Sequence, residues 1–193
     1  MRRLERRAQG LPQKDVLRGA LMGSVYTFPS NLNGKYGTVS GYFSSYALVP
    51  DCYGDVCKPG FLNESIKKRV KSGHGYPLMF HHDVNQIIGA VTLIEDRTEG
   101  VYMEADFLDT ARAQEVRTLV KSVVVYQMSF AYSTQESGLI TLPDGTKANE
   151  LRRCELFEVT ITPTPAQPLS VLTDVKSALE IEADRLLRSI EVM

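Results

Sequence analysis

The sequence lacks the features of a membrane-spanning, secreted or nucleic-acid-coating protein. It contains no run of about 18 apolar residues, so we expect no helix that crosses a bilayer. Its basic N-terminus is not followed by the apolar segment of a secretory signal. The 22 basic and 23 acidic side chains nearly cancel, which argues against a main role in coating nucleic acid or an anionic membrane. The three cysteines, an odd number, do not make a disulfide framework, and a reducing compartment fits best.

Charge and glycine content divide the chain into three parts. Residues 1–18 hold six basic and two acidic side chains, a local charge of +4, and glycine or proline interrupts any periodicity up to residue 34. We therefore expect a loosely ordered basic arm over residues 1–34. A main domain is predicted over residues 35–172, and a C-terminal helix or tail over residues 173–193.

The main domain carries mostly strand signals. Alternation of apolar and polar residues is clearest over 101–107. Six more extended segments are predicted over 36–49, 77–80, 86–94, 123–132, 138–141 and 154–162. Apolar residues at helical spacing predict three helices, which contain Phe61 to Val70, Ala113 to Val120 and Thr173 to Ile190. Seven strands with a few helices indicate a mainly β chain (α+β), a β-barrel or sandwich decorated by helices.

Two of the three histidines stand at the end of an apolar strand. His81 and His82 follow the segment 77–80 and precede Asp83. A neutral imidazole in such a place can act as a general base, because its ordinary pKa of about 6.5 is close to neutral pH. The local sequence by itself favours a simpler interpretation, in which one histidine is a surface residue and the other a hydrogen-bonded turn residue.

Ser129 lies in a segment with two different faces. One face carries large side chains suited to a barrel interior, namely Val124, Tyr126, Met128, Phe130 and Tyr132. Ser129 belongs to the outer face, among small or flexible neighbours. A hydroxyl there can serve as a nucleophile if a base takes its proton. Without that context, an ordinary strand serine is the simpler interpretation.

Glu158 has a similar position on a later strand. Phe157, Val159 and Ile161 are expected to point inward, so Glu158 and Thr160 point away from the core. A carboxylate in that position can orient an imidazole and stabilise its protonated form. The alternative is an exposed strand charge, and the periodicity is compatible with both.

Together these motifs resemble the prohead (capsid maturation) proteases of tailed bacteriophages. Residues 37–43 and 51–61 resemble the opening of that family, an extended segment and then a turn leading into a helix. His82-Asp83 matches its His-Asp motif, and 129–132 is similar to its Ser-x-Gly-aromatic motif. Its closing motif resembles 158–168. The likeness covers about residues 37–172 in the right order.

This resemblance implies a fold, a mechanism and a setting. The related herpesvirus maturation proteases imply a closed barrel wrapped by helices, and a triad of His82, Ser129 and Glu158 on its outer wall, with no cofactor. The implied substrates and partners are the scaffold protein or the scaffold-like extension of the major capsid protein, and the chain itself by autocleavage. The implied location is the prohead within the host cytoplasm. No binding of nucleic acid or membrane is expected, and the resemblance is compatible with a homodimer.

Two departures from the family pattern leave alternatives open. Ala131 stands where the family has glycine, which favours a catalytically inactive structural or scaffold component with the same fold. His81 precedes His82, so either imidazole is available as the base. A cysteine peptidase based on Cys154 and a metal hydrolase are further alternatives, both weaker. The side chains available to a metal are Cys52, Cys57, His74, His81, His82 and Asp83, at spacings unusual for zinc.

Overall fold

Nine strands and three helices make up residues 23–191, the part of the chain that the computed structural model describes. The strands are β1 (Val25–Thr27), β2 (Thr38–Ser45), β3 (Asp55–Cys57), β4 (Pro77–Phe80), β5 (Ile87–Asp96), β6 (Gly100–Phe107), β7 (Gln127–Thr141), β8 (Lys147–Thr162) and β9 (Leu172–Lys176). The helices are α2 (Asn63–Lys71), α3 (Ala111–Lys121) and α4 (Ala178–Glu191). The prediction of a mainly β chain with a few helices is therefore confirmed.

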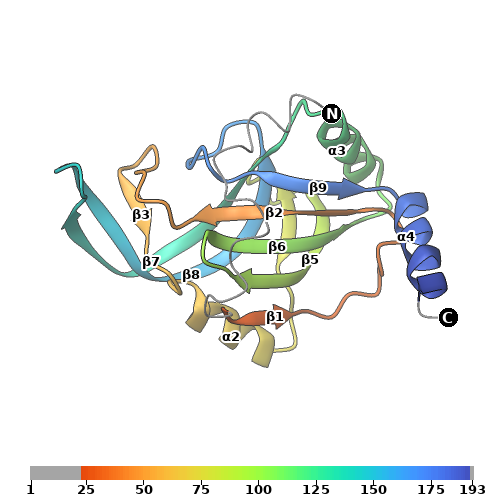
Figure 1. Cartoon of the computed structure of the whole chain (residues 1–193), viewed down its shortest axis with the longest axis horizontal. Helices are drawn as coiled ribbons and strands as arrows, with labels where there is room; N and C mark the ends of the chain where they lie inside the picture. Colours follow the sequence, from red (N-terminus) through yellow and green to blue (C-terminus); the bar gives the residue numbers. More distant parts are fainter. Residues whose placement is uncertain (1–22, 192–193) are drawn as a thin grey trace.

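All nine strands belong to one mixed sheet (Figure 1). Its order is β3-β8-β4-β5-β6-β2-β9, with β1 paired to β5 and β7 paired to β8. The closed barrel that we expected is not supported, because no continuous ladder joins β7 to β9. These strands meet only at an isolated bridge between Gln127 and Val171, flanked by hydrogen bonds from the Met128 amide to the Ser170 carbonyl and from the Leu172 amide to the Tyr126 carbonyl.

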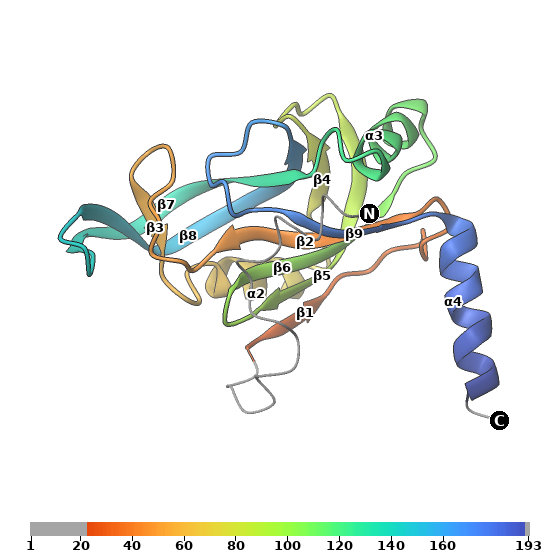
Figure 2. The same ribbon diagram turned by 45° about the horizontal axis from the view of Figure 1, so that its top comes forward.

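The two ends of the molecule differ in character (Figure 2). At one end the distal parts of β7 and β8 form a long hairpin that projects beyond the rest of the sheet. At the other end α4 lies beside β9. Between them, buried apolar residues from β2, β4, β5, β6 and β8 form the core, among them Phe43, Leu78, Ile88, Met103 and Val159.

The expected boundaries need correction at both ends of the chain. Val25–Thr27 is a strand that pairs with β5, and Tyr26 and Phe28 are buried in the core, so residues 25–28 do not belong to a loose arm. Residues 1–22 lie outside the described residues. The prediction of a helix from Thr173 is wrong for its first residues, because Leu172–Lys176 pairs with β2. The helix begins only at Ala178.

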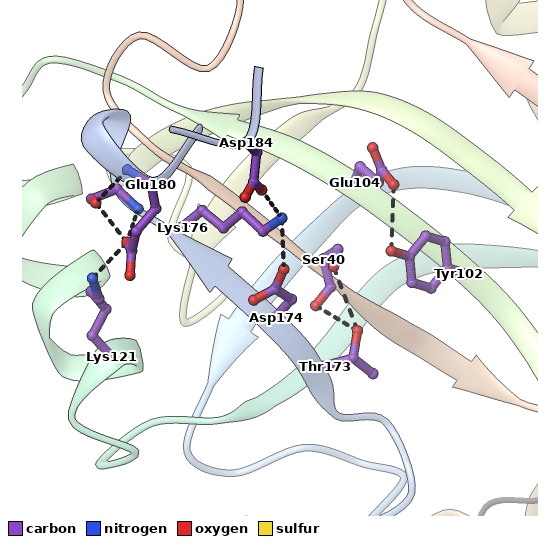
Figure 3. A network of polar contacts seen from close by, with 10 residues as sticks. Ser40, Tyr102, Glu104, Lys121, Thr173, Asp174, Lys176, Glu180 and Asp184 are labelled. Atoms are coloured by element: carbon purple, nitrogen blue, oxygen red, sulfur yellow. Dashed lines mark hydrogen bonds and ion pairs between the residues drawn. The ribbon is translucent and has the colours of Figure 1, made fainter. Parts of the chain in front are cut away.

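Polar contacts attach α4 to the sheet (Figure 3). Lys176 of β9 donates to Asp184 of α4 at 2.7 Å and also pairs with Asp174, while Lys121 of α3 donates to Glu180 at 2.8 Å. A cavity of about 380 Å³ lies between this helix and strands β2, β6 and β9. None of the three residues expected to form the triad lines that cavity.

Two irregularities change the faces that we expected on β7 and β8. The positive φ of Val123 (60°) precedes the strand, so Val124 is exposed and Val125 is buried, the reverse of the predicted alternation. On β8 the register shifts between the pairs Ala131–Glu158 and Tyr132–Leu156, which leaves Phe157 as the extra residue of a bulge. Phe157 is therefore 52% exposed rather than inward, whereas Val159 and Ile161 are buried as predicted.

Candidate active site

The pairing of β7 with β8 places Ser129 and Glu158 on the same face of the sheet. Ser129 is opposite Thr160, and Ala131 is opposite Glu158. Side chains of paired residues share a face and alternate along each strand, so Ser129, Thr160 and Glu158 lie on one face and are diagonal or direct neighbours. Diagonal neighbours are roughly 7–8 Å apart, about the span of an imidazole ring with one hydrogen bond on each side.

This face is covered, although we expected it to be open. Ser129 is 8% exposed and Glu158 is 4% exposed. The turn after β4 lies over it, because the His81 amide donates to the Ile161 carbonyl at 3.1 Å and the His82 amide donates to the Thr160 hydroxyl at 3.0 Å. The face that we expected to form an exposed outer wall is thus covered by the turn after β4.

The backbone of that turn is held in an uncommon conformation. His81 and His82 both have positive φ, 59° and 58°, a region that non-glycine residues seldom occupy at a cost of roughly 1–3 kcal/mol each. Hydrogen bonds on the other side of the turn stabilise it. Asp83 accepts from the Asn85 amide and from the Gln86 side chain, and the pKa of Asp83 is lowered first by the Gln86 contact and then by the Asn85 amide. Gln86 in turn accepts from Arg112 of α3 at 2.7 Å.

The turn aims the two imidazoles in different directions. His82 Nδ1 donates to Glu158 Oε1 at 2.6 Å. The His81 ring instead packs edge-on against Phe80, with ring centroids 4.4 Å apart. His82 is therefore the imidazole that pairs with the carboxylate. Glu158 Oε2 is buried and has no hydrogen-bond partner within residues 23–191, so the His82 ring is the main stabilising contact of this carboxylate.

Ser129 and His82 line the same cavity, which has a volume of about 370 Å³. The His82 side chain is 39% exposed, and its Nε2 atom is free of the bond to Glu158. Among the described residues, no hydrogen bond joins the Ser129 hydroxyl to this ring. Serine–histidine bonds in substrate-free enzymes are commonly long and tighten when substrate binds.

The other candidate residues have different surroundings. Cys154 is buried, and burial raises the pKa of its thiol to about 11, which disfavours the nucleophilic thiolate. Within residues 23–191, no three His, Cys, Asp or Glu side chains gather closely enough to hold a metal ion. His74 is exposed in the segment between α2 and β4. Over the same residues, no helix is both long and apolar enough to cross a membrane.

The sequence analysis missed two kinds of residue at this site. Thr160 appeared only as a neighbour of Glu158, yet its hydroxyl holds the His82 amide. Asp51, Asp55 and Ser170 also line the cavity, far from its histidine and serine in the chain. Residues 51–61 were noted only for their likeness to the family, and no local pattern shows that Asp51, Asp55 and Ser170 reach the same cavity as Ser129.

Comparison with known proteins places the chain in a family. A family model described as Caudovirus prohead serine protease matches residues 25–183. No curated protein sequence matches the chain. The chain is similar in structure to the protease of Kaposi's sarcoma herpesvirus, solved in complex with a hexapeptide phosphonate inhibitor, with a TM-score of 0.50 and 8% identity over 82% of this chain and 77% of that one.

The chain is also similar in structure to a second solved protease. It is the capsid assembly protease of bacteriophage T4, with a TM-score of 0.49 and 11% identity over 74% of this chain and 93% of that chain. The herpesvirus likeness, at such low identity, concerns the fold. The family match spans most of the described residues, from the first strand into the last helix. The chain therefore belongs to the caudovirus prohead serine proteases, a family of serine peptidases that act in phage capsid maturation.

Proposed function

We propose that this serine peptidase cleaves scaffold protein, or the scaffold-like extension of the major capsid protein, through a triad of Ser129, His82 and Glu158. The observation that carries the proposal is the 2.6 Å hydrogen bond between His82 Nδ1 and the buried Glu158, with Ser129 in the same cavity. The other ring nitrogen of His82 is then available to take the serine proton.

The proposed reaction follows from the roles that these groups can take. His82 Nε2 accepts the hydroxyl proton as Ser129 Oγ bonds to the peptide carbonyl carbon, and the proton passes to the leaving amine as the peptide bond breaks. Water then attacks the acyl-enzyme by the same route and releases the acid. Glu158 keeps the proton on Nδ1 and stabilises the imidazolium. Its charge acts strongly because the carboxylate is shielded from water.

The segment after β8 also lines the cavity and is the place where donors to the oxyanion are expected. Pro163, Pro165 and Pro168 have no amide proton. The Thr164 amide already donates to the Thr162 hydroxyl, and the amides of Leu169 and Ser170 donate to Gln167. The backbone amides of Ala166 and Gln167 have no acceptor within residues 23–191. We propose these two amides as the oxyanion donors, each worth roughly 3–4 kcal/mol of transition-state stabilisation.

The setting proposed for this reaction is the immature capsid in the host cytoplasm. The scaffold and capsid proteins are then the partners, and confinement in the shell raises their effective concentration. A homodimer and self-cleavage stay predictions.

A cleavage assay tests the proposal. The purified full chain is incubated with its scaffold protein, and products are followed by electrophoresis and mass spectrometry. Ser129→Ala and His82→Ala are expected to leave the scaffold intact, whereas His81→Ala, the matched control one residue away, is expected to cleave. Cleavage by Ser129→Ala at the wild-type rate would refute the proposed nucleophile.

An inactive capsid component with this fold is the second candidate. Ala131 in place of glycine favours it, as does the missing bond between Ser129 and His82. The same assay separates the two functions, because an inactive component leaves the scaffold intact in the wild type as well.

A further inference from the structure

The cavity that contains Ser129 and His82 also carries two carboxylates and no basic side chain. Asp51 and Asp55 line it, and no lysine or arginine is among its lining residues. With the imidazole neutral, the formal charge of the lining is therefore negative. A peptide bound here meets that charge close to the proposed nucleophile.

Both carboxylates are fixed in place. Asp55 Oδ2 accepts from the Tyr132 hydroxyl at 3.2 Å, and Oδ1 accepts from the Asn149 side chain at 2.8 Å. Asp51 Oδ1 accepts from the amides of Tyr53 and Asp55, each at 2.9 Å. These donors are neutral, so neither charge is cancelled, and a carboxylate keeps lone pairs for further donors.

Groups in the cavity wall experience this negative charge. The pKa of Tyr132 is raised, first by burial and then by the charges of Asp55 and Asp51. The pKa of the Cys57 thiol is raised to about 12, again first by burial, and the same two carboxylates add to the rise.

An independent observation indicates a polar ligand at this place. Ser170 lines the cavity and is 1% exposed, and its hydroxyl has no hydrogen-bond partner among the described residues. A buried hydroxyl without a partner costs free energy, so a ligand that supplies one is favoured.

The remaining wall is apolar and includes Phe43, Phe130 and Leu151. A long side chain with an aliphatic stem and a charged end fits such a combination, because the stem contacts the apolar wall while the end reaches the polar groups. Tyr132, which contacts Asp55, is three residues beyond Ser129 on β7, roughly 10 Å along the strand and on its other face. Because Ser129, Tyr132 and Asp55 all line one cavity, a lysine or arginine bound at the scissile bond can extend toward Asp55 within it.

We propose that this cavity recognises a lysine or arginine side chain on the acyl side of the scissile bond, and that Asp51 and Asp55 determine this specificity. The inference rests on the proposed function, since it takes Ser129 as the nucleophile. Glutamate and aspartate are disfavoured at the same substrate position by repulsion from the two carboxylates. Both aspartates act on the choice of substrate and leave the proton transfers to His82.

A library of peptides, made by cutting a cell proteome with a protease specific for aromatic residues so that internal lysine, arginine and glutamate all remain, tests this inference. The full chain digests the library, and mass spectrometry maps every new cleavage site. We expect lysine or arginine on the acyl side at least about tenfold more often than glutamate, a ratio that falls as salt screens the charges. The double variant Asp51→Asn/Asp55→Asn is expected to lose most of this preference. Asp144→Asn is the matched control, because Asp144 also accepts a backbone amide in a turn but lies outside the cavity.

The outcomes separate this inference from the proposed function. Cleavage without a cationic preference, or a preference that the double variant retains, refutes the specificity and leaves the peptidase function standing. A library left uncut by the wild type refutes the proposed function and the specificity with it. The wild-type measurement is decisive even if the double variant fails to fold.

Discussion

Replacement of Glu158 by glutamine separates a catalytic from a structural role for this carboxylate. Glutamine keeps the size of the side chain and removes its charge, so the His82 ring loses the group that stabilises its protonated form. The 2.6 Å bond and the 6% exposure of the Glu158 side chain put this interaction in a shielded environment. We expect kcat to fall by about 10²- to 10⁴-fold, roughly 3–5 kcal/mol of activation free energy.

The same variant is not expected to lose stability, although it loses activity. A buried carboxylate with one oxygen unpartnered within residues 23–191 carries a desolvation cost, and a neutral amide carries less. The free energy of unfolding of Glu158→Gln is therefore expected to stay unchanged or rise by about 1 kcal/mol. Scaffold cleavage rates and urea unfolding of the same preparation check both quantities. A kcat within tenfold of wild type, or a loss of stability that accounts for the loss of activity, would refute the reasoning.

Three further changes test other parts of the account. Thr160→Val removes the acceptor of the His82 amide, so we expect a loss of about 1–3 kcal/mol in unfolding free energy and a lower kcat at similar KM, with both restored by Thr160→Ser. Alkylation at neutral pH is expected to modify exposed Cys52 and spare buried Cys154, without loss of cleavage, and inactivation in step with alkylation of Cys154 would instead support a thiol nucleophile. The pKa of Glu180 is lowered to about 2, first by its contact with Lys121, so this contact stabilises α4 fully above the ordinary carboxyl pKa near 4.5 and is lost as the pH falls toward 2. Hydrogen exchange of the α4 amides is expected to accelerate between these two pH values. An unchanged exchange rate would contradict this prediction.

The sequence was sufficient where a local pattern continued without interruption. The alternation over 101–107 predicted β6, and the helical spacing of Phe61 to Val70 and of Ala113 to Val120 predicted α2 and α3. The pattern failed where a single residue changed its phase. Because of the bulge at Phe157, the alternation of inward and outward side chains along β8 changes phase at that residue. An apolar stretch with high β propensity contains no sequence signal for such an extra residue.

The C-terminal helix was predicted to begin too early, although the sequence contains a local motif that marks its true start. Ser177 and Glu180 form a reciprocal cap, in which the Ser177 amide donates to the Glu180 carboxylate and the Glu180 amide donates to the Ser177 hydroxyl. This spacing marks the start of α4 and leaves Leu172–Lys176 free to pair with β2. At the other end, Val25–Thr27 is too short to show periodicity, and only its pairing with β5 makes it a strand.

The candidate site was predictable in its residue types but not in its environment. The likeness to a family selected His82, Ser129 and Glu158, and periodicity put Ser129 and Glu158 on faces that we expected to be open, whereas both side chains are buried. Periodicity could not show that the turn after β4 covers that face, since two consecutive residues with positive φ have no sequence signature when they are histidines. The segment 51–61 was noted for its likeness to the family, but the position of Asp51 and Asp55 in the cavity could not be predicted, because tertiary contacts bring them there.

The most direct test of the central claim is a crystal structure of the chain after reaction with a peptide phosphonate, the kind of inhibitor bound in the herpesvirus relative. We predict a covalent bond between phosphorus and Ser129 Oγ, with His82 Nε2 within hydrogen-bond distance of the adduct and Nδ1 still bonded to Glu158. A phosphonate attached to another side chain, or an adduct on Ser129 that the His82 ring does not contact, would contradict the account.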